Sequence, residues 1–305
     1  MTKFHHKLNK KNMKIAGFTF IRNAVQNDYS ILEAIHSILP ICDEFIVAHG
    51  NSSDSTLALI ESIKSPKIKI IQTTWDDTLR EGGKTFALET DKAFAAISPD
   101  MDWAFYIQGD ECVHEKYLET IKKEMEICLD NKNIEGLLFK YIHFYGSFDY
   151  HAYSRRWYNR EIRIIRNLKG MESYKDAQGF RFNGQKLKVK LIDAYMYHYG
   201  WVKAPNGLKT KIKNTGQFYS RDDEWIENTY NEEFTFDYGN AERLLKFNET
   251  HPKVFQERVK RVNWNFSFDP TKIKNNLDFR RKLLAKIEDV TGVRLFAYKN
   301  YKRIK

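Results

Sequence analysis

Short apolar runs alternate with amphipathic stretches from Lys14 to about Leu138. Ile15–Ile21 is apolar and rich in β-forming residues throughout, which is typical of a strand buried on both sides. The stretches between the runs carry apolar residues at helical spacing. The predicted strands are Ile15–Ile21, Glu44–Ala48, Lys67–Thr73 and Trp103–Ile107, and the predicted helices are Tyr29–Leu39, Leu57–Ile63 and Phe86–Ile97. This alternation predicts an α/β fold with a doubly wound, mostly parallel sheet.

The pattern changes in the second half of the chain. Further strands are expected at Gly136–Tyr145, at Glu161–Arg166 and within Leu187–Tyr199. From Asp222 onward the sequence is polar and helical, with helices expected at Ala241–Phe247, Val254–Val262 and Asn276–Val290. Because no repeat or Ser/Gly linker divides the chain, we expect an α/β domain over 13–220 and a helical, basic extension over 221–305 packed on it.

The net charge of +10 is concentrated at the two ends of the chain. Residues 1–12 and 299–305 each carry four basic residues and no acid, so the body between them is nearly neutral. A nucleic-acid-binding surface is therefore not expected. The tails have two interpretations: they are solvated and partly disordered, or they contact anionic lipid.

Composition excludes several other classes of protein. Hydrophobic residues make up 42% and charged residues 30% of the 305, which permits a large core and excludes wholesale disorder. The three cysteines form no CxxC motif, so a disulfide scaffold is not expected. No apolar run approaches the roughly 20 residues of a membrane-spanning helix, and no secretory signal is evident. We expect a cytoplasmic protein, with peripheral contact to the inner face of the membrane through its tails.

Polar and acidic side chains follow each predicted strand of the first half. In an open parallel sheet, ligands bind beyond the carboxyl ends of the strands. The residues at these positions are Arg22 and Asn23, the turn ending at Asp54, Asp76 and Asp77, and Asp110 and Glu111. No GxGxxG or GxxxxGK[ST] motif occurs, which argues against dinucleotide-binding and P-loop proteins. Zinc-hydrolase histidine pairs and the GxSxG elbow are also missing.

Three candidate sites, at Asp54, at Asp110 and Glu111, and at His198, have two interpretations each. Asp54 is either a helix cap or a carboxylate that accepts hydrogen bonds from a nucleobase. Asp110 and Glu111 form either a surface turn or a pair of hard oxygen ligands for Mg²⁺ or Mn²⁺. His198, embedded among aromatic residues, is either a packed core residue or a ligand.

Three segments together resemble family-2-type glycosyltransferases of the GT-A, Rossmann-like fold. They are Ile15–Asn23 (IAGFTFIRN), Asp43–Thr56 (DEFIVAHGNSSDST) and Asp102–Glu111 (DWAFYIQGDE). The resemblance covers residues 13–205, and it departs from the family pattern at His49-Gly50 and at Gln108, which replaces the first acid of the D-x-D metal motif.

The resemblance implies roles for particular residues. Asp110 and His198 are the expected ligands of a Mn²⁺ or Mg²⁺ cofactor, and Asp176 is the expected catalytic base, with Asp76 and Asp77 as rivals. Arg163 and Arg166 form strand-face salt bridges or face the diphosphate. The expected donor-binding residues are Thr19, Arg22, Asn23, Asp54, Lys84 and Gln108.

The implied function is metal-dependent, hexosyltransferase-like sugar transfer, with inversion expected. The donor is a nucleotide-diphosphate sugar, with a UDP-sugar favoured, and the acceptor is the hydroxyl of a glycan or lipid-linked molecule in polysaccharide synthesis. Two alternatives stay open: a nucleotidyltransferase with a similar sheet, and a non-catalytic module that binds carbohydrate or nucleic acid.

Overall fold

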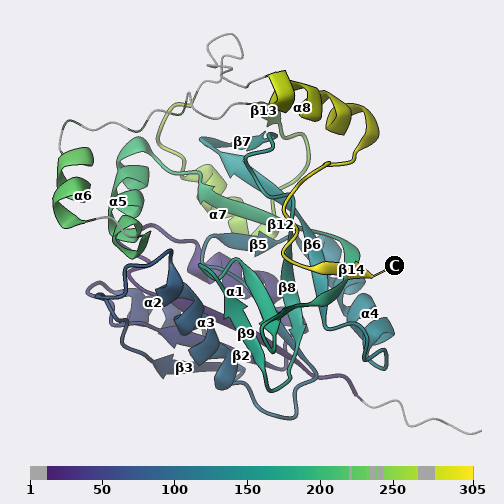
Figure 1. Ribbon diagram of the computed structural model, residues 1–305. Helices are drawn as coiled ribbons and strands as arrows, with labels where there is room; N and C mark the ends of the chain where they lie inside the picture. Colours follow the sequence, from purple (N-terminus) through teal and green to yellow (C-terminus); the bar gives the residue numbers. More distant parts are fainter. Residues whose placement is uncertain are drawn as a thin grey trace, which may run out of the picture.

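A computed structural model of the chain describes residues 12–219, 222–231, 233, 236, 238, 243–266 and 279–304. Within these residues, eleven strands form one curved, mixed sheet flanked by helices, and three short strands form a second sheet (Figure 1). The strands of the long path run in the order β13-β7-β6-β8-β4-β1-β2-β3.

The first half of the chain builds the parallel part of this sheet. Strand β1 (Ile15–Ile21) pairs in parallel with β2 (Glu44–His49) on one side and with β4 (Trp103–Tyr106) on the other, and β3 (Ile68–Gln72) extends the sheet beyond β2. The chain therefore runs outward from β1 to β3 and returns to β4. Strand order reverses between β1 and β4, and this reversal opens a crevice at their carboxyl ends. The predicted parallel α/β arrangement is confirmed.

Successive residues of these strands face two different helices. Ile15, Phe45 and Phe105 pack on the side of α1 (Ile31–Ile38). Their sequence neighbours Ala16 and Phe18 pack on the side of α3 (Lys84–Ala95). The central strands β1 and β4 are apolar throughout because both of their faces are covered, whereas the edge strand β3 is only partly buried and carries Lys69 and Gln72. The short helix α2 (Thr56–Glu61) follows β2.

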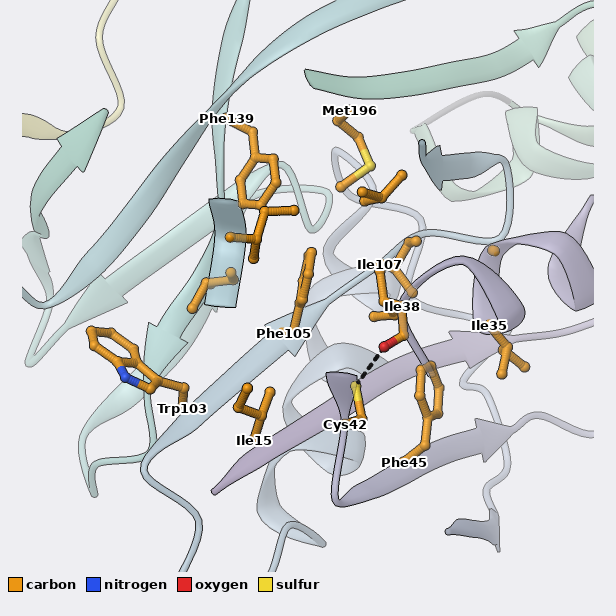
Figure 2. Packing of buried hydrophobic residues seen from close by; sticks show 14 of the residues in the cluster. Ile15, Ile35, Ile38, Cys42, Phe45, Trp103, Phe105, Ile107, Phe139 and Met196 are labelled. Carbon is orange, nitrogen blue, oxygen red and sulfur yellow. Dashed lines mark hydrogen bonds between the residues drawn. The ribbon is translucent and has the colours of Figure 1, made fainter. Parts of the chain in front are cut away.

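Figure 2 shows the packing on the α1 side. Trp103 and Phe105 of β4 and Phe139 of β6 belong to the same apolar cluster. The Cys42 thiol donates a hydrogen bond to the Ile38 carbonyl at 3.2 Å, which closes the last turn of α1 against β2.

The second half adds antiparallel and long strands beyond β4. Strand β8 (Arg160–Arg166) is antiparallel to β4 and to β6 (Gly136–Tyr145), and the 14-residue β12 (Lys188–Trp201) is parallel to β6. The remaining elements here are β5 (Glu111–Val113), α4 (Leu118–Cys128), β7 (Ser147–Ala152), β9 (Met171–Tyr174), β10 (Gly179–Phe182) and β11 (Gln185–Lys186).

The C-terminal part corrects two expectations. Its elements are α5 (Pro205–Gly216), η3 (Gln217–Tyr219), α6 (Asp223–Thr229), β13 (Leu244–Lys246), α7 (Gln256–Lys260), α8 (Phe279–Thr291) and β14 (Lys302–Ile304). Residues 244–246, predicted as helix, are a strand because their backbone pairs with β7. The basic C-terminal tail is not solvated throughout, since β14 pairs in parallel with β12.

Several predictions lie outside the described residues. They include the N-terminal tail up to residue 11, the domain boundary at 220–221 and the start of the helix predicted at Asn276. In the part of the chain that is described, no helix has both the length and the apolar character needed to cross a bilayer.

Candidate functional site

A cavity of about 400 Å³ lies at the carboxyl ends of β1 and β4, where the strand order reverses. This volume falls in the range of small-molecule sites. The cavity wall combines the exit of β1, the loop after β4, and the α5–η3 segment. Its polar lining residues include Arg22, Asn23, Gln26, Asn27, Gln108, Asp110, Asp176, Gln178, Lys211, Asn214, Thr215 and Gln217.

One side of the cavity is aromatic. Phe20, Trp75, Phe86, Phe218 and Tyr219 all line it, and Phe86 packs against the other four with ring centroids 5.3 to 5.9 Å apart. These residues come from β1, the β3–α3 loop, α3 and η3, so tertiary packing alone gathers them. Flat aromatic faces suit the stacking of a nucleobase or of the apolar face of a sugar.

Arg22 and Asn23 fix the exit of β1. The Arg22 guanidinium donates to Asp77, with Nη2 3.1 Å from Oδ2, and its central carbon lies 5.5 Å from the Trp75 ring centroid. Asn23 adopts a positive φ of 52°, and its Oδ1 accepts the Ser53 N–H at 2.8 Å. Both side chains therefore present fixed polar groups at the cavity mouth.

Asp54 lies next to this turn but does not line the cavity. Its Oδ2 accepts the Gln26 N–H at 2.8 Å, and its Oδ1 accepts the Thr56 N–H at 3.0 Å. The carboxylate thus connects the β1 exit to the first residue of α2, whose N-cap position is Ser55.

Two other predicted donor-binding residues also lie outside the cavity lining. Thr19 is fully buried within β1, where its hydroxyl faces the Phe20 carbonyl at 3.4 Å. Lys84 begins α3, and its largely exposed ammonium is 4.0 Å from Glu81.

Gln108 does line the cavity, and its Nε2 donates to the Ala177 carbonyl at 3.3 Å.

Asp110 faces the cavity and is surrounded by cationic and imidazole groups. Lys211 Nζ donates to its Oδ2 at 2.9 Å and to the Gly200 carbonyl at 3.0 Å. His198 Nε2 is 3.7 Å from the same carboxylate oxygen. Burial by itself raises the pKa of Asp110, but Lys211, His198 and Lys203 outweigh it and hold that pKa below its usual value. Asp110 is therefore ionised at neutral pH.

A second histidine determines which nitrogen of His198 carries the proton. Burial lowers the pKa of both His198 and His143, so both rings are neutral at pH 7. His143 Nε2 is 2.7 Å from the Tyr158 carbonyl and must donate to it, which leaves His143 Nδ1 as an acceptor. His198 Nδ1, 3.2 Å away, therefore donates to His143, and the lone pair of His198 Nε2 faces Asp110.

Asp110 and His198 present two acceptor groups of the kinds that bind divalent cations. A carboxylate oxygen and an imidazole lone pair that face each other across 3.7 Å are acceptors without a shared proton, and Mn²⁺ accepts both ligand types. The hydrogen bond from the far ring nitrogen is the usual support of a metal-binding histidine. Among the described residues, no group of three or more His, Cys, Asp or Glu side chains converges, so the protein offers two ligands at this point.

Glu111 does not share the site with Asp110. It begins β5 with its side chain pointing into the core, where Arg163 Nη2 and Nε donate to its two oxygens at 2.8 and 2.9 Å and the Tyr141 hydroxyl donates at 2.8 Å. The interpretation of Asp110 and Glu111 as paired metal ligands is thus wrong, because Asp110 lies in the turn before β5 and faces the cavity, whereas Arg163 and Tyr141 hold Glu111 in the core.

Arg163 and Arg166 do not line the cavity. The strand-face salt bridge is correct for Arg163, which is fully buried with Glu111. Arg166 instead donates to main-chain carbonyls after α4, including those of Ile134 at 2.8 Å and Leu129 at 3.0 Å. Arg163 thus connects β8 to β5, and Arg166 connects β8 to the loop after α4.

Asp176 lines the cavity on the side of η3. The Tyr219 hydroxyl donates to its Oδ2 at 3.0 Å. A Cβ on Gly83 would lie 2.5 Å from that of Asp176, so the positive φ of 74° and the missing side chain at Gly83 make room for this loop.

Of the rival carboxylates, Asp77 pairs with Arg22, and Asp76 accepts the Thr78 N–H at 2.9 Å.

Sequence reasoning missed Lys211, His143 and Tyr219. Lys211 lies in a lysine-rich helix, a pattern that usually indicates a solvated face, and Tyr219 lies in a short turn. His143 gave a signal: it is a polar residue inside the otherwise apolar end of β6.

Searches against protein-family models and against curated proteins find no match. Among solved structures, S. aureus TarS 1–349 in complex with UDP matches with 14% identity and a TM-score of 0.38, over 70% of this chain and 69% of that one. A 4-diphosphocytidyl-2C-methyl-D-erythritol synthase from Anaerococcus prevotii matches with 13% identity and a TM-score of 0.37, over 70% and 99%.

Glucosyl-3-phosphoglycerate synthase from Mycobacterium tuberculosis, in complex with Mn²⁺, UDP and phosphoglyceric acid, matches with 21% identity and a TM-score of 0.29. The match covers 44% of each chain. Similarities this low carry no argument about function.

The strand order, the return from β3 to β4 and the cavity at the reversal place the chain in the Rossmann-like, GT-A fold class.

Proposed function

We propose that this protein transfers a sugar from a nucleotide-diphosphate sugar to an acceptor hydroxyl. The observation that carries the proposal is the cavity at the strand-order reversal, which combines an aromatic wall with Asp110, Lys211 and Asp176. His198 lies beside Asp110, outside the cavity lining. The aromatic wall suits a base or sugar face, and the charged group suits a diphosphate. We favour a UDP-sugar as the donor.

Asp110 and His198 are the proposed ligands of Mn²⁺ or Mg²⁺. When bound, the metal supplies positive charge that stabilises a departing diphosphate. Thr19, Arg22, Asn23, Asp54, Lys84 and Gln108 remain the proposed donor-binding set. Asp54, Thr19 and Lys84 act in this proposal by shaping the β1 exit and the start of α3.

Lys211 is the group of this chain that faces the charge developing on the diphosphate. Its ammonium is fixed by Asp110 and by the Gly200 carbonyl, so it is oriented before the donor binds. The Tyr29 ring lies 5.4 Å from the same ammonium and shields it from water.

Asp176 is the proposed base, and the reaction is then inverting. A carboxylate in hydrogen-bond reach of the acceptor hydroxyl removes its proton as the sugar is attacked. The hydroxyl of Tyr219 holds one oxygen of Asp176, which leaves the other for the acceptor. The proposed acceptor is a glycan or lipid-linked molecule of polysaccharide synthesis, reached at the membrane through the basic tails.

A thermal-unfolding screen with UDP-, GDP-, dTDP- and CMP-sugars, with and without Mn²⁺, tests this proposal. A donor at 100 times its Kd adds about 2.7 kcal/mol of stability. Asp110→Asn removes the charge that faces Lys211 and His198, so we expect it to abolish the Mn²⁺-dependent shift. Asp193→Asn, an exposed carboxylate paired with Lys140, is the matched control. Stabilisation by no donor, or an unchanged shift in Asp110→Asn, would contradict the proposal.

A further inference from the structure

Exposed apolar side chains gather on one segment of the chain, residues 279–298. Half of the large apolar residues that are exposed in the described part of the chain lie there. Single exposed apolar residues are normal, but a cluster of them marks an interaction surface. They are Phe279, Leu283, Val290, Val293, Leu295, Phe296 and Tyr298.

Helix α8 carries three of them as a stripe. Phe279, Leu283 and Val290 are 81%, 48% and 79% exposed, and their spacing of four and seven residues puts them on one face. In Figure 1 the helix lies at the edge of the molecule, far from the parallel half of the sheet.

The opposite face of α8 is polar and attaches the helix to the fold. Arg281 and Glu288 line a cavity of about 520 Å³ together with the 153–156 loop. Glu288 accepts from Arg155 at 2.8 Å and from Arg294 at 2.6 Å. The apolar stripe therefore points away from the molecule while the helix stays fixed.

The turn after α8 extends the apolar surface. Phe296 is 81% exposed, and its φ of 57° places a bulky residue in the left-handed region. That conformation is unfavourable for such a residue, and it holds an aromatic ring in solvent. Phe296 thus adds an exposed apolar side chain next to the stripe, although its backbone adopts an unfavourable conformation.

The charge of this segment indicates what covers it. Residues 279–298 contain five Lys or Arg and two acids. Both acids are paired: Glu288 with two arginines, and Asp289 with Arg243 at 2.7 Å. On α8, Lys282 borders the stripe, and Lys286 lies within it, three residues after Leu283 and four before Val290. An apolar stripe bordered by basic residues is typical of helices that lie in the interface of an anionic bilayer.

We propose that residues 279–298 form a docking surface for an anionic lipid bilayer, with Phe279, Val290 and Phe296 entering the interface. A second copy of this chain is a poorer occupant, because two strongly basic surfaces would face each other. The inference goes beyond sugar transfer and does not depend on it. It also differs from contact through basic tails alone, since it requires the apolar side chains.

Co-sedimentation with vesicles tests the proposal. The full chain is mixed with vesicles of phosphatidylcholine alone, or of phosphatidylcholine with phosphatidylglycerol. We expect binding to the anionic vesicles, weakening as salt rises from 0.1 to 1 M and the screening length falls from about 10 to 3 Å. Phe279→Ser/Val290→Ser should lower the partition coefficient by about tenfold or more.

Ile127→Ser is the matched control, because it removes a 57% exposed apolar side chain from α4. Equal binding by the double variant and the control would overturn the proposal, as would failure of the wild type to bind anionic vesicles. A wild-type dimer that the double variant converts to monomer, seen by sedimentation velocity, would assign the surface to self-association instead. Donor binding without vesicles should be the same in all variants, so a failed docking surface is distinguishable from a failed transferase.

Discussion

Asp110 and Glu111 are neighbours in the chain, yet their carboxylates have different roles. Asp110 faces the cavity beside Lys211, and Glu111 is enclosed in the core with Arg163. A cation lies against each of them: Lys211 against Asp110 and Arg163 against Glu111. At the cavity this arrangement leaves a group able to interact with a ligand, whereas in the core every oxygen is already satisfied.

The Glu111–Arg163 pair predicts a strong effect on stability. Arg163→Met leaves the Glu111 carboxylate buried without its counter-charge, which typically costs about 3–5 kcal/mol. Urea unfolding measures this loss. The double variant Glu111→Gln/Arg163→Met removes both charges and should recover much of it. A double variant as unstable as the single one would show that packing, rather than the unpaired charge, sets the effect.

Asp176 predicts a separation of transfer from donor binding. Asp176→Asn removes the proposed base, so sugar transfer should fall by at least ~10²-fold while donor affinity stays within a few-fold. Steady-state transfer and donor binding by calorimetry measure the two. Tyr219→Phe keeps the carboxylate and should lose less. Loss of donor binding would move Asp176 to the nucleotide side, and near-normal transfer would give its role to Asp76 or Asp77.

At the scale of elements, the C-terminal strand β14 pairs with β12, and the residue Asn300 just before it packs against β10 and β8. Asn300, which precedes β14, is 2% exposed, and its carbonyl accepts from Arg181 at 3.0 Å. The side chains of Asn300 and of Glu161 in β8 both approach Gly179, where a Cβ would lie 2.2 and 2.8 Å from them. A carboxyl group is therefore enclosed where the end of the chain docks.

This carboxyl predicts a pH dependence of stability. Burial raises the pKa of Glu161 from 4.5 to about 7, although Arg163 opposes the shift. The folded state then binds the Glu161 proton more tightly than the unfolded state, so this contribution is complete below about pH 4.5 and is lost as pH rises through 7. Relative to Glu161→Gln, the wild type should lose roughly 2–3 kcal/mol between pH 4.5 and pH 8 in urea unfolding. If the free energy of unfolding of the wild type and of Glu161→Gln changed with pH in the same way, the pKa of Glu161 would not be raised in the folded protein.

At the scale of the whole molecule, the cavity belongs to two distant parts of the chain. The parallel half supplies the β1 exit and the loop after β4, and α5–η3 supplies Lys211, Asn214 and Phe218. The Gly83 N–H donates to the Phe218 carbonyl at 2.7 Å and joins the two parts. A ligand in the cavity contacts both parts and stabilises their association.

Hydrogen exchange tests this arrangement. A bound nucleotide sugar should slow amide exchange in α5 and η3 as well as at the β1 exit, because opening either part would break contacts with the ligand. The segment 279–298, remote from the cavity, serves as the internal reference. Protection confined to the β1 exit would mean that α5 does not contact the donor.

The sequence by itself determined the parallel half of the fold. Ile15–Ile21 and Gly136–Tyr145 are strands with the predicted bounds, because a continuous apolar run is a local signal. Since strand ends gather at one edge, it also identified Arg22, Asn23 and Asp110, and the family resemblance added Gln108 and Asp176. All five line the cavity. Leu244–Lys246 and the C-terminal strand were misread, because pairing with a distant strand leaves no local signal.

Only the tertiary structure decided what surrounds those residues. Three contacts were not predictable: Lys211 donates to Asp110, His143 accepts a hydrogen bond from His198, and Glu111 pairs with Arg163. The two residues of each contact are 52 to 101 positions apart in the chain. Spacing in the sequence reports which residues share a strand or a helix face. It carries no information on which distant charge will lie opposite, because that choice follows from the packing of β12, β8 and α5 around the sheet edge.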